Sequence, residues 1–429
     1  MTASGARTAA RTPDLSRRDL TLDLTRVACV LLVVVIHMLM TAVGPGPDGG
    51  LVATRPLIEQ PWYVAATWVG QIMPLFFVVG GFAAVMGWRS WTRKGGDATG
   101  YVRNRALRLG QPALPLFVFF AVVLTAVALV GIAPEIVDAA AVGVGSPLWF
   151  IAAYLVCQAA TPLLIGLHAR APKRALLVLL VAVVLVDVAR YSTGITEIGL
   201  LNLLFVWPLV HQFGFWYADG WFDRRHPLTL VGLAAACYLA LWPLTSIGWY
   251  HLDMLDNLNP PTLPLVLLGL AQACILRLLK RPLTWLMTLR IMQGAVFVVG
   301  SRLMTVYLWH LPVILAVTGL SLLIPGAAPA PDSAAWWWSR PLFLVVVLVV
   351  LYGLTLLIAR WEAVRGLGPT PSVAIVAVGV VLILLPPLAI IEWNLNLWIA
   401  LGGAVAFAIA VPLLRGRRRA AEGAGSLDA

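Results

Sequence analysis

Two ionisable side chains, Arg26 and His37, bracket a run of ten apolar residues. On a helix, the eleven steps between them cover about 16 Å at ~1.5 Å per residue. A run this apolar predicts a membrane-spanning helix, with Arg26 near one interface and His37 deep in the hydrocarbon. An ionisable group at that depth costs on the order of a few kcal/mol, which marks a candidate functional residue. A buried imidazole suits a general base, a proton path or a plain hydrogen bond between helices.

The residues just before this run add a carboxylate. Asp23 and Arg26 are three residues apart, so they share a helix face and can form an ion pair. The alternative interpretation is an interfacial anchor that only fixes the end of the helix.

Three arginines form a second candidate site. Arg105 and Arg108 share a helix face, and Arg103 lies close to them in the sequence. Guanidinium groups bind phosphate in a bidentate manner, so the cluster suits a phosphorylated ligand. Loops on the cytoplasmic side of membrane proteins are basic in any case, and topology alone is the alternative.

Two further histidines lie within apolar segments. His310 precedes Pro312, which distorts a helix, and His211 lies among aromatic residues. Both allow the same roles as His37. Trp149 lies near a predicted outer interface, where an aromatic belt is expected. The remaining histidines fall in or near loops and count as background: His168, His226 and His251.

No metal site is predicted. The sequence has no HExxH motif, and its apolar segments lack the carboxylates of a metal cage, with Asp187 as the main exception. The cysteines show no CxxC or Cys/His spacing and are expected to be small core residues: Cys29, Cys157, Cys237 and Cys274. Gly80 and Gly81 allow either a neighbouring helix or a ligand to approach a helix backbone closely.

The elements that position these residues follow from the composition. The 429-residue chain is 61% hydrophobic and 11% charged, whereas soluble domains carry about 25% charged residues. Its mean hydropathy of +0.91 excludes a soluble enzyme. We therefore predict an all-α, polytopic membrane protein with about twelve transmembrane helices. The expected spans are 22–42, 63–88, 112–132, 147–166, 174–190, 199–219, 228–248, 262–280, 303–324, 341–360, 373–391 and 395–414.

The charges give the expected orientation. If the N-terminus is cytoplasmic and the spans alternate, the outer segments hold only Arg55, Arg190 and Arg340. Such a bias follows the positive-inside rule and predicts that both termini are cytoplasmic. It also explains the net charge of +11 without a nucleic-acid partner. We expect a disordered basic segment at 1–19, an interfacial helix at 282–300 and a cytoplasmic tail at 415–429.

Taken together and in order, the motifs resemble the acyltransferase 3 family, integral-membrane enzymes that include O-acetyltransferases of lipopolysaccharide and other glycans. The resemblance covers a domain at 20–360, the first ten spans. It rests on LDLTRVA with the Arg-x10-His spacing, PLFFVVGGF at 74–82, the RxxR pair, PLWFIAAYL at 147–155 and YLWHLP at 307–312. The chain departs from the family pattern at Val27, where Gly is usual, and at Gly80-Gly81, where Ser-Gly is common. Two additional helices, within 361–414, exceed the usual ten.

The resemblance implies transfer of an acyl group, commonly acetyl, from cytosolic acyl-CoA to a hydroxyl of an extracytoplasmic carbohydrate or related acceptor. It implies His37 as the general base, since an imidazole suits proton transfer near neutral pH. The donor would be bound by Arg26, Arg103, Arg105 and Arg108. The substrate-binding residues would be Asp23, which orients Arg26, together with Trp149 and His310. The cell membrane and its lipid bilayer are the expected setting, and no metal is implied.

A transporter or flippase of a glycan precursor is the main alternative. Twelve spans with both termini inside fit one equally well. Against it, the sequence shows no related halves and few buried acids for proton coupling. Acceptors that are amino sugars, donors with longer acyl chains and a catalytically inactive scaffold are further alternatives. The oligomeric state is open.

Overall fold

The computed structural model describes residues 19–45, 51–131, 134–362, 364 and 366–416. The predicted N-terminal segment 1–19, apart from Asp19, and the tail beyond residue 416 lie outside these residues.

Helices make up most of the described chain, and the only sheet within it is a two-stranded antiparallel ribbon. The elements in chain order are α1 (Leu20–Leu39), β1 (Ala42–Pro45), β2 (Leu51–Thr54), α2 (Tyr63–Gly70), α3 (Met73–Thr92), α4 (Ala98–Val130), α5 (Pro134–Gly145), η2 (Ser146–Leu148), α6 (Trp149–Arg170), α7 (Pro172–Thr193), η3 (Thr196–Leu204), α8 (Val206–Ala218), α9 (Pro227–Ser246), α10 (Leu263–Leu278), α11 (Lys280–Leu286), α12 (Arg290–Gly300), α13 (Leu303–Leu322), α14 (Ala334–Glu362), α15 (Val373–Trp393) and α16 (Leu397–Arg415).

The prediction of an all-α, polytopic membrane protein is confirmed. Eleven helical segments among the described residues are long and apolar enough to span a membrane. The pair α10 and α11, bent by 60°, makes a twelfth if it is counted as one span. Each predicted span overlaps one of these segments. The stretch predicted as an interfacial helix, 282–300, contains the end of α11 and the short apolar helix α12.

Capping residues explain where the helices that carry the site begin. Asp19 precedes α1 and accepts a hydrogen bond from the Thr21 amide at 3.1 Å. Asp97 precedes α4 and accepts one from the Gly100 amide at 2.9 Å. Such side chains satisfy amide groups that have no partner within the first turn. Both helices therefore have defined starting points.

Glycines bring α3 and α8 into backbone contact. A Cβ atom at Gly81 would overlap the carbonyl oxygen of His211, and one at Gly214 would overlap that of Val78. Small residues permit such close approach, as is common between membrane helices. The Gly80-Gly81 step is thus explained by helix packing, the simpler of the two sequence interpretations.

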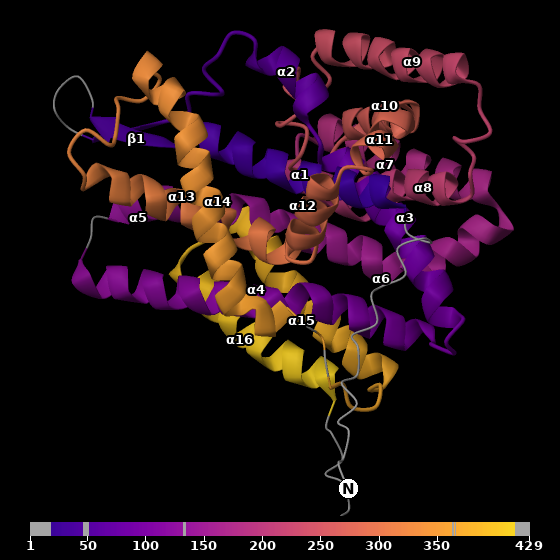
Figure 1. Cartoon of the computed structure of the whole chain (residues 1–429). Helices are drawn as coiled ribbons and strands as arrows, with labels where there is room; N and C mark the ends of the chain where they lie inside the picture. Colours follow the sequence, from indigo (N-terminus) through magenta and orange to yellow (C-terminus); the bar gives the residue numbers. More distant parts are fainter. Residues whose placement is uncertain (1–18, 46–50, 132–133, 363, 365, 417–429) are drawn as a thin grey trace, which may run out of the picture.

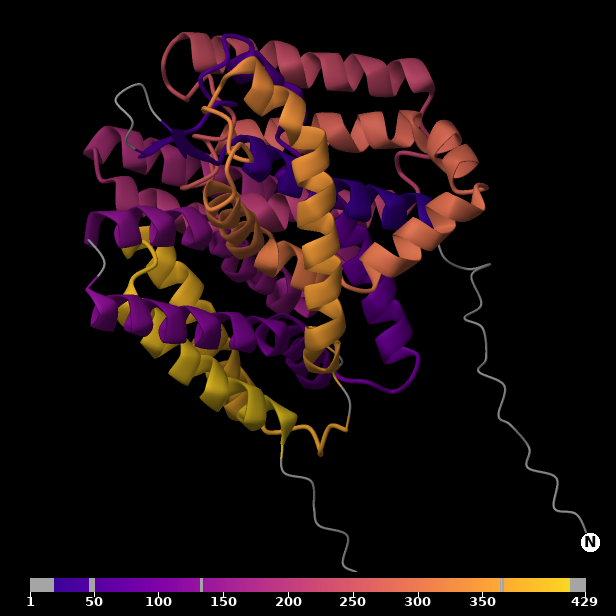
Figure 2. The ribbon, with the colours of Figure 1, turned by 60° about the vertical axis from the view of Figure 1, so that its left-hand side comes forward.

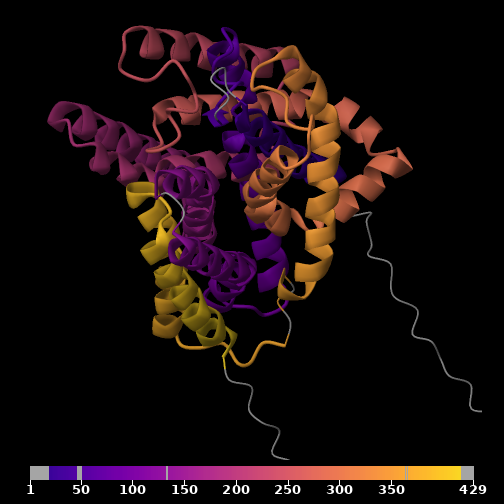
Figure 3. The same ribbon diagram turned by 90° about the vertical axis from the view of Figure 1, so that its left-hand side faces the viewer.

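The C-terminal helices α15 and α16 pack against α4, and α15 also packs against α6. Figures 1, 2 and 3 show this pair (yellow) beside α4 at one side of the molecule, with α9 at the opposite side. The rings of Phe117 and Phe407 stack at 4.8 Å, and Gly403 lies against Phe117. The last two helices are therefore joined to the preceding helices by a continuous apolar interface.

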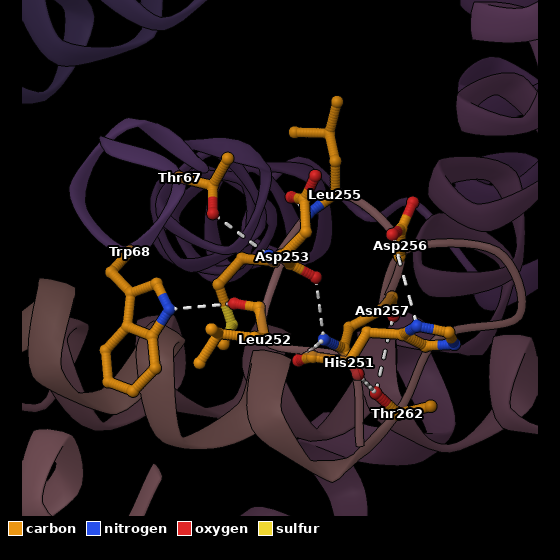
Figure 4. A network of polar contacts seen from close by, with 10 residues as sticks. Thr67, Trp68, His251, Leu252, Asp253, Leu255, Asp256, Asn257 and Thr262 are labelled. Carbon is orange, nitrogen blue, oxygen red and sulfur yellow. Dashed lines mark hydrogen bonds and ion pairs between the residues drawn. The ribbon is translucent and has the colours of Figure 1, made fainter. Parts of the chain in front are cut away.

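A polar network holds the loop between α9 and α10 (Figure 4). The Met254 amide donates to the Thr67 hydroxyl at 3.0 Å, and the indole of Trp68 donates to the Leu252 carbonyl at 2.9 Å. Asn257 bonds the backbone of the same loop. The loop is thereby fixed to α2, which belongs to the segment leading into α3.

Candidate active site

His37 and His310 form a pair where α1 and α13 pack against each other. The Nε2 atom of His310 lies 3.1 Å from the Nδ1 atom of His37, and the ring centroids are 4.9 Å apart. His37 lies in the last turn of α1, nearer the helix end than the predicted span 22–42 implied. The ring of His310 is 1% exposed, while His37 is partly exposed. The structure thus brings together a predicted base and a predicted substrate-binding residue.

The carbonyl groups around the pair determine where the protons lie. His37 Nδ1 is 3.0 Å from the Val33 carbonyl oxygen, and His310 Nδ1 is 2.5 Å from that of Tyr307. A carbonyl oxygen only accepts hydrogen bonds, so both Nδ1 atoms carry protons. In a neutral pair, His310 Nε2 is then an acceptor facing the N–H of His37. His37 Nε2 is left unprotonated, with no hydrogen-bond partner among the described residues. This atom can accept a proton from a substrate.

An apolar cavity of about 10 Å³ lies about one helical turn from the pair along both helices. Its wall includes Val30, Val33 and Tyr307, and the last two also supply the carbonyl groups that hold the histidines. A space of this size holds about one water-sized group. On α1, the sequence steps from Arg26 to Val30, Val33 and His37 follow one helix face. The cavity therefore lies on the line between the predicted donor end and the predicted base.

Arg105 and Arg108 lie at the N-terminal part of α4, on the side of the molecule where α1 begins. The Arg105 guanidinium lies 4.8 Å above the Tyr101 ring and against Gly87 of α3, where a Cβ atom would overlap it. Arg108 is exposed, and the charges of both Arg105 and Arg26 act on it. Three of the four predicted donor-binding arginines thus share one electrostatic environment.

The ion pair predicted from the spacing of Asp23 and Arg26 is present, with 3.9 Å between Arg26 Nη1 and Asp23 Oδ1. The Nε atom of Arg26 is buried and has no hydrogen-bond partner in the described structure. A buried donor without a partner costs about 1–3 kcal/mol. This end of α1 therefore has a donor available for an anionic ligand.

Arg103 points away from this cluster, and its donors are already used. Its guanidinium bonds the carbonyl oxygens of Leu414 and Arg415 at the end of α16 and that of Gly368 in the loop before α15. Carbonyl groups in the last turn of a helix have no partner within the helix, and a cation satisfies them well. Arg103 thus fixes the C-terminal helix, and nothing in its geometry supports the predicted contact with a donor.

Trp149 is packed in the core. Its ring is 5% exposed and stacks on Trp207 at 5.3 Å, and Trp207 stacks in turn on Phe77 at 4.2 Å. Trp149 follows Pro147, whose carbonyl accepts a hydrogen bond from the Tyr307 hydroxyl at 2.7 Å. Trp149 therefore supports the wall that carries Tyr307, and its contact with an acceptor stays a prediction.

His211 is a further buried histidine, between α3 and α8. Its Nδ1 atom is 3.1 Å from the Phe77 carbonyl oxygen, while its Nε2 atom is buried and has no hydrogen-bond partner among the described residues. No group of three metal-ligating side chains occurs in the described part of the chain.

Sequence reasoning missed a polar cluster at the end of α6 and α8. His168 Nδ1 lies 2.9 Å from Gln212 Oε1, and its Nε2 lies 3.1 Å from Asp219 Oδ2. Arg89 bonds the other oxygen of Asp219 at 2.7 Å. Partial burial alone raises the pKa of Asp219, but the bonds from Arg89 and His168 outweigh it and hold that pKa below its ordinary value. The partners come from three helices, so no local spacing indicated them.

Sequence reasoning also missed the role of Tyr307. It lies three residues before His310, so the two share a helix face, and this spacing was the available signal.

A family model described as an acyltransferase domain matches residues 19–360. The matched range begins at the residue that caps α1 and ends within α14, so it includes both histidines and all four arginines. Comparisons with curated proteins and with solved structures gave no match.

Proposed function

The chain belongs to the acyltransferase 3 family, and from that premise we propose that it moves an acetyl group from cytosolic acetyl-CoA to a hydroxyl of an extracytoplasmic carbohydrate. The family supplies the reaction class. The observation that carries the proposal is the His37–His310 pair, which leaves one imidazole nitrogen unprotonated, with a small apolar cavity about one helical turn away.

The donor enters along α1 from the end that carries Arg26, Arg105 and Arg108. These guanidinium groups suit the diphosphate of CoA, which they would bind through charge-assisted hydrogen bonds. The pantetheine arm has twelve chain bonds from its phosphate ester to the sulfur and reaches about 14 Å at ~3.6 Å per three bonds. Arg26 and His37 are about 16 Å apart along the helix. A donor held by its diphosphate at Arg26 therefore presents its thioester close to His37.

The transfer step follows from the proton positions. His37 Nε2 removes the proton from the acceptor hydroxyl while that oxygen attacks the thioester carbonyl carbon. The carbon–sulfur bond breaks, and the imidazolium of His37 returns the proton to the sulfur of CoA. His310 accepts the Nδ1–H bond of His37 and so stabilises the imidazolium while the charge is present. His310 is a positioning residue in this step, because it acts through His37.

The small cavity supports acetyl as the acyl group. Its volume of about 10 Å³ accommodates a methyl-sized group between Val30, Val33 and Tyr307. A longer chain would need the surrounding side chains to move, and close-packed interiors resist such movement.

The test is transfer of label from radiolabelled acetyl-CoA by the purified, detergent-solubilised protein, with and without crude envelope glycans. We expect label on glycan with the wild-type protein and none with His37→Ala, at equal yield and melting temperature. Label that stays on CoA with every glycan and donor would favour a glycan transporter over an enzyme. A fully active His37→Ala protein would remove the assigned base while leaving the reaction class intact.

A further inference from the structure

A second basic pocket lies outside the cluster just described, where the loop after α8 meets the start of α9 and the end of α10. Its volume is about 470 Å³, within the range of ~300–1,000 Å³ that is typical of small-molecule sites. The side chains of Arg224, Arg225, His226 and Arg277 line it. A pocket of this size with several guanidinium groups suits a ligand that carries more than one phosphate.

The positive charge of this pocket is only partly neutralised. The one carboxylate in its wall, Asp223, forms ion pairs with Arg277 at 2.6 Å and with Lys280 at 3.4 Å. Arg224 and Arg225 are exposed, and neither has an acidic partner among the described residues. Arg224 bonds only the Asp219 carbonyl oxygen, and Arg225 stacks on Trp221 at 4.6 Å. Two guanidinium groups are therefore available to an anion.

The rest of the wall is apolar. Pro227, Leu230 and Leu278 form this part, next to the arginines. A flat heterocyclic base can pack on such a surface while its phosphates reach the guanidinium groups. Apolar and cationic surfaces side by side are what a nucleotide requires.

Two observations relate the pocket to the start of α1. The charges of Asp223 and Arg277, from the pocket, and of Asp19, from the α1 cap, all act on Tyr217. Helix α11 follows directly on the pocket residue Leu278 and packs against α1. Asp19 and Arg26 are about 10 Å apart along the helix. A ligand part near Asp19 is thus about 10 Å from the arginine that is proposed to bind the diphosphate.

The geometry points to this pocket as the site of the nucleotide end of the acyl donor, its 3′-phosphate and adenine. The assignment rests on the proposed function, because it supposes that the donor is a CoA thioester. It places three parts of the donor along one line: the nucleotide beside Asp19, the diphosphate at Arg26 and the acyl group below His37. The loop of Arg224 and Arg225 then determines affinity for CoA and takes no part in the chemistry.

The first test measures binding and needs no transfer. The probe is adenosine 3′,5′-bisphosphate, and the readout is the melting temperature of the full-length protein in detergent, followed by tryptophan fluorescence. We expect a rise of about 2 °C or more for the wild type at saturating probe, because a ligand that binds only the folded state stabilises it. The double variant Arg224→Gln with Arg225→Gln should lose this rise.

The matched control removes two arginines from another loop at the same end of the molecule, Arg170→Gln with Arg174→Gln. Both are exposed, and neither lines the pocket. The control should keep the full rise in melting temperature. This result would distinguish a specific binding site from general electrostatic attraction of anions. An equal loss in both variants would overturn the assignment. So would an equal rise with inorganic phosphate, or a rise that occurs only with anionic lipid in nanodiscs.

The second test compares two donors, acetyl-CoA and S-acetyl-4′-phosphopantetheine, which lacks the nucleotide. The pocket variant should raise the KM for acetyl-CoA about tenfold or more, since charge-assisted contacts are lost, and leave the KM for the shorter donor unchanged. Equal effects on both donors would overturn the nucleotide site. Bisphosphate binding without transfer from either donor would instead remove the proposed function, so the two failures are distinguishable.

Discussion

Two polar centres of this helical bundle, at Asp187 and at the His37–His310 pair, differ in whether their hydrogen-bond acceptors already have partners. The carboxylate of Asp187 on α7 is 1% exposed and receives three hydrogen bonds from other elements. The donors are Asn202 Nδ2 at 2.8 Å, the Tyr250 hydroxyl at 2.9 Å and the Leu263 amide at 3.1 Å. The centre joins α7 to η3, to the loop after α9 and to the start of α10. Both oxygens of the Asp187 carboxylate are therefore used by the fold.

The His37–His310 centre has the opposite character. Each Nδ1 atom is held by a carbonyl oxygen of its own helix, and His310 Nε2 is used by His37. One atom, His37 Nε2, has no partner among the described residues. The comparison of the two centres shows that burial of a polar group does not by itself indicate a functional site. The His37 ring is partly exposed and keeps an unused proton acceptor, so this centre is the one that we propose acts on a substrate.

The largest expected effect comes from removing that acceptor. His37→Gln should lower the initial rate of acetyl transfer about 10³-fold, because proton transfer by a positioned side chain contributes ~10²–10⁴-fold and glutamine is no base. The melting temperature should stay within about 2 °C of the wild type, so that this variant loses activity but not stability, in contrast to a change at Asp187. A rate within threefold of the wild type would contradict the distinction between the two centres.

The next effect concerns the Asp187 centre, where the carboxylate is substituted. Asp187→Ala leaves three buried donors without an acceptor and should lower the free energy of unfolding by about 3 kcal/mol. Transfer per folded molecule should be unchanged. Denaturation followed by fluorescence measures the first quantity, and rates corrected for folded protein measure the second. Tyr250→Phe removes only one of the three donors and should cost about 1 kcal/mol. A specific loss of rate in the Asp187 variant would show that this centre is not purely structural.

A smaller effect separates His310 from His37. His310→Phe keeps a flat ring but removes the acceptor for the His37 N–H, and the rate should fall about tenfold, the equivalent of one hydrogen bond in the transition state. The KM for acetyl-CoA should stay the same, because His310 is proposed to act only through His37. A loss as large as that of His37→Gln would instead identify His310 as a direct participant.

The smallest effect concerns the Asp219 cluster, which is also polar but partly exposed. Its carboxyl has a lowered pKa, so its ion pairs add stability above the ordinary value near 3.9, and that stability is lost as the pH falls through the lowered pKa. Asp219→Asn should therefore melt about 1–2 °C below the wild type at pH 5–7, since exposed pairs contribute little. The two melting temperatures should begin to approach each other below about pH 4 and become equal below the lowered pKa of Asp219. A gap that persists at lower pH would assign the effect to packing.

The fold was largely predictable, and the site only in part. Long apolar runs located the eleven candidate spans and the bent pair of α10 and α11, because hydrophobic length is a local property of the sequence. The contact between His37 and His310 joins positions 273 apart, and no periodicity reports such a distance. Arg103 was grouped with Arg105 and Arg108 by sequence proximity, yet residues two apart on a helix face different directions. In the structure Arg103 bonds the end of α16, and its contact with a donor stays a prediction.

The bonds of Arg103 also bear on how the chain is completed in the membrane. Its acceptors at Leu414 and Arg415 lie more than three hundred positions later, at the end of the last described helix. During synthesis α4 is made before α16. The Arg103 guanidinium therefore lacks these two acceptors until α16 has been inserted. Only then does the helix that carries Arg105 and Arg108 gain its final support. The two helices outside the family match would thus complete the assembly, and a chain that stops before residue 414 would leave Arg103 with only the Gly368 carbonyl and the Thr370 hydroxyl as acceptors.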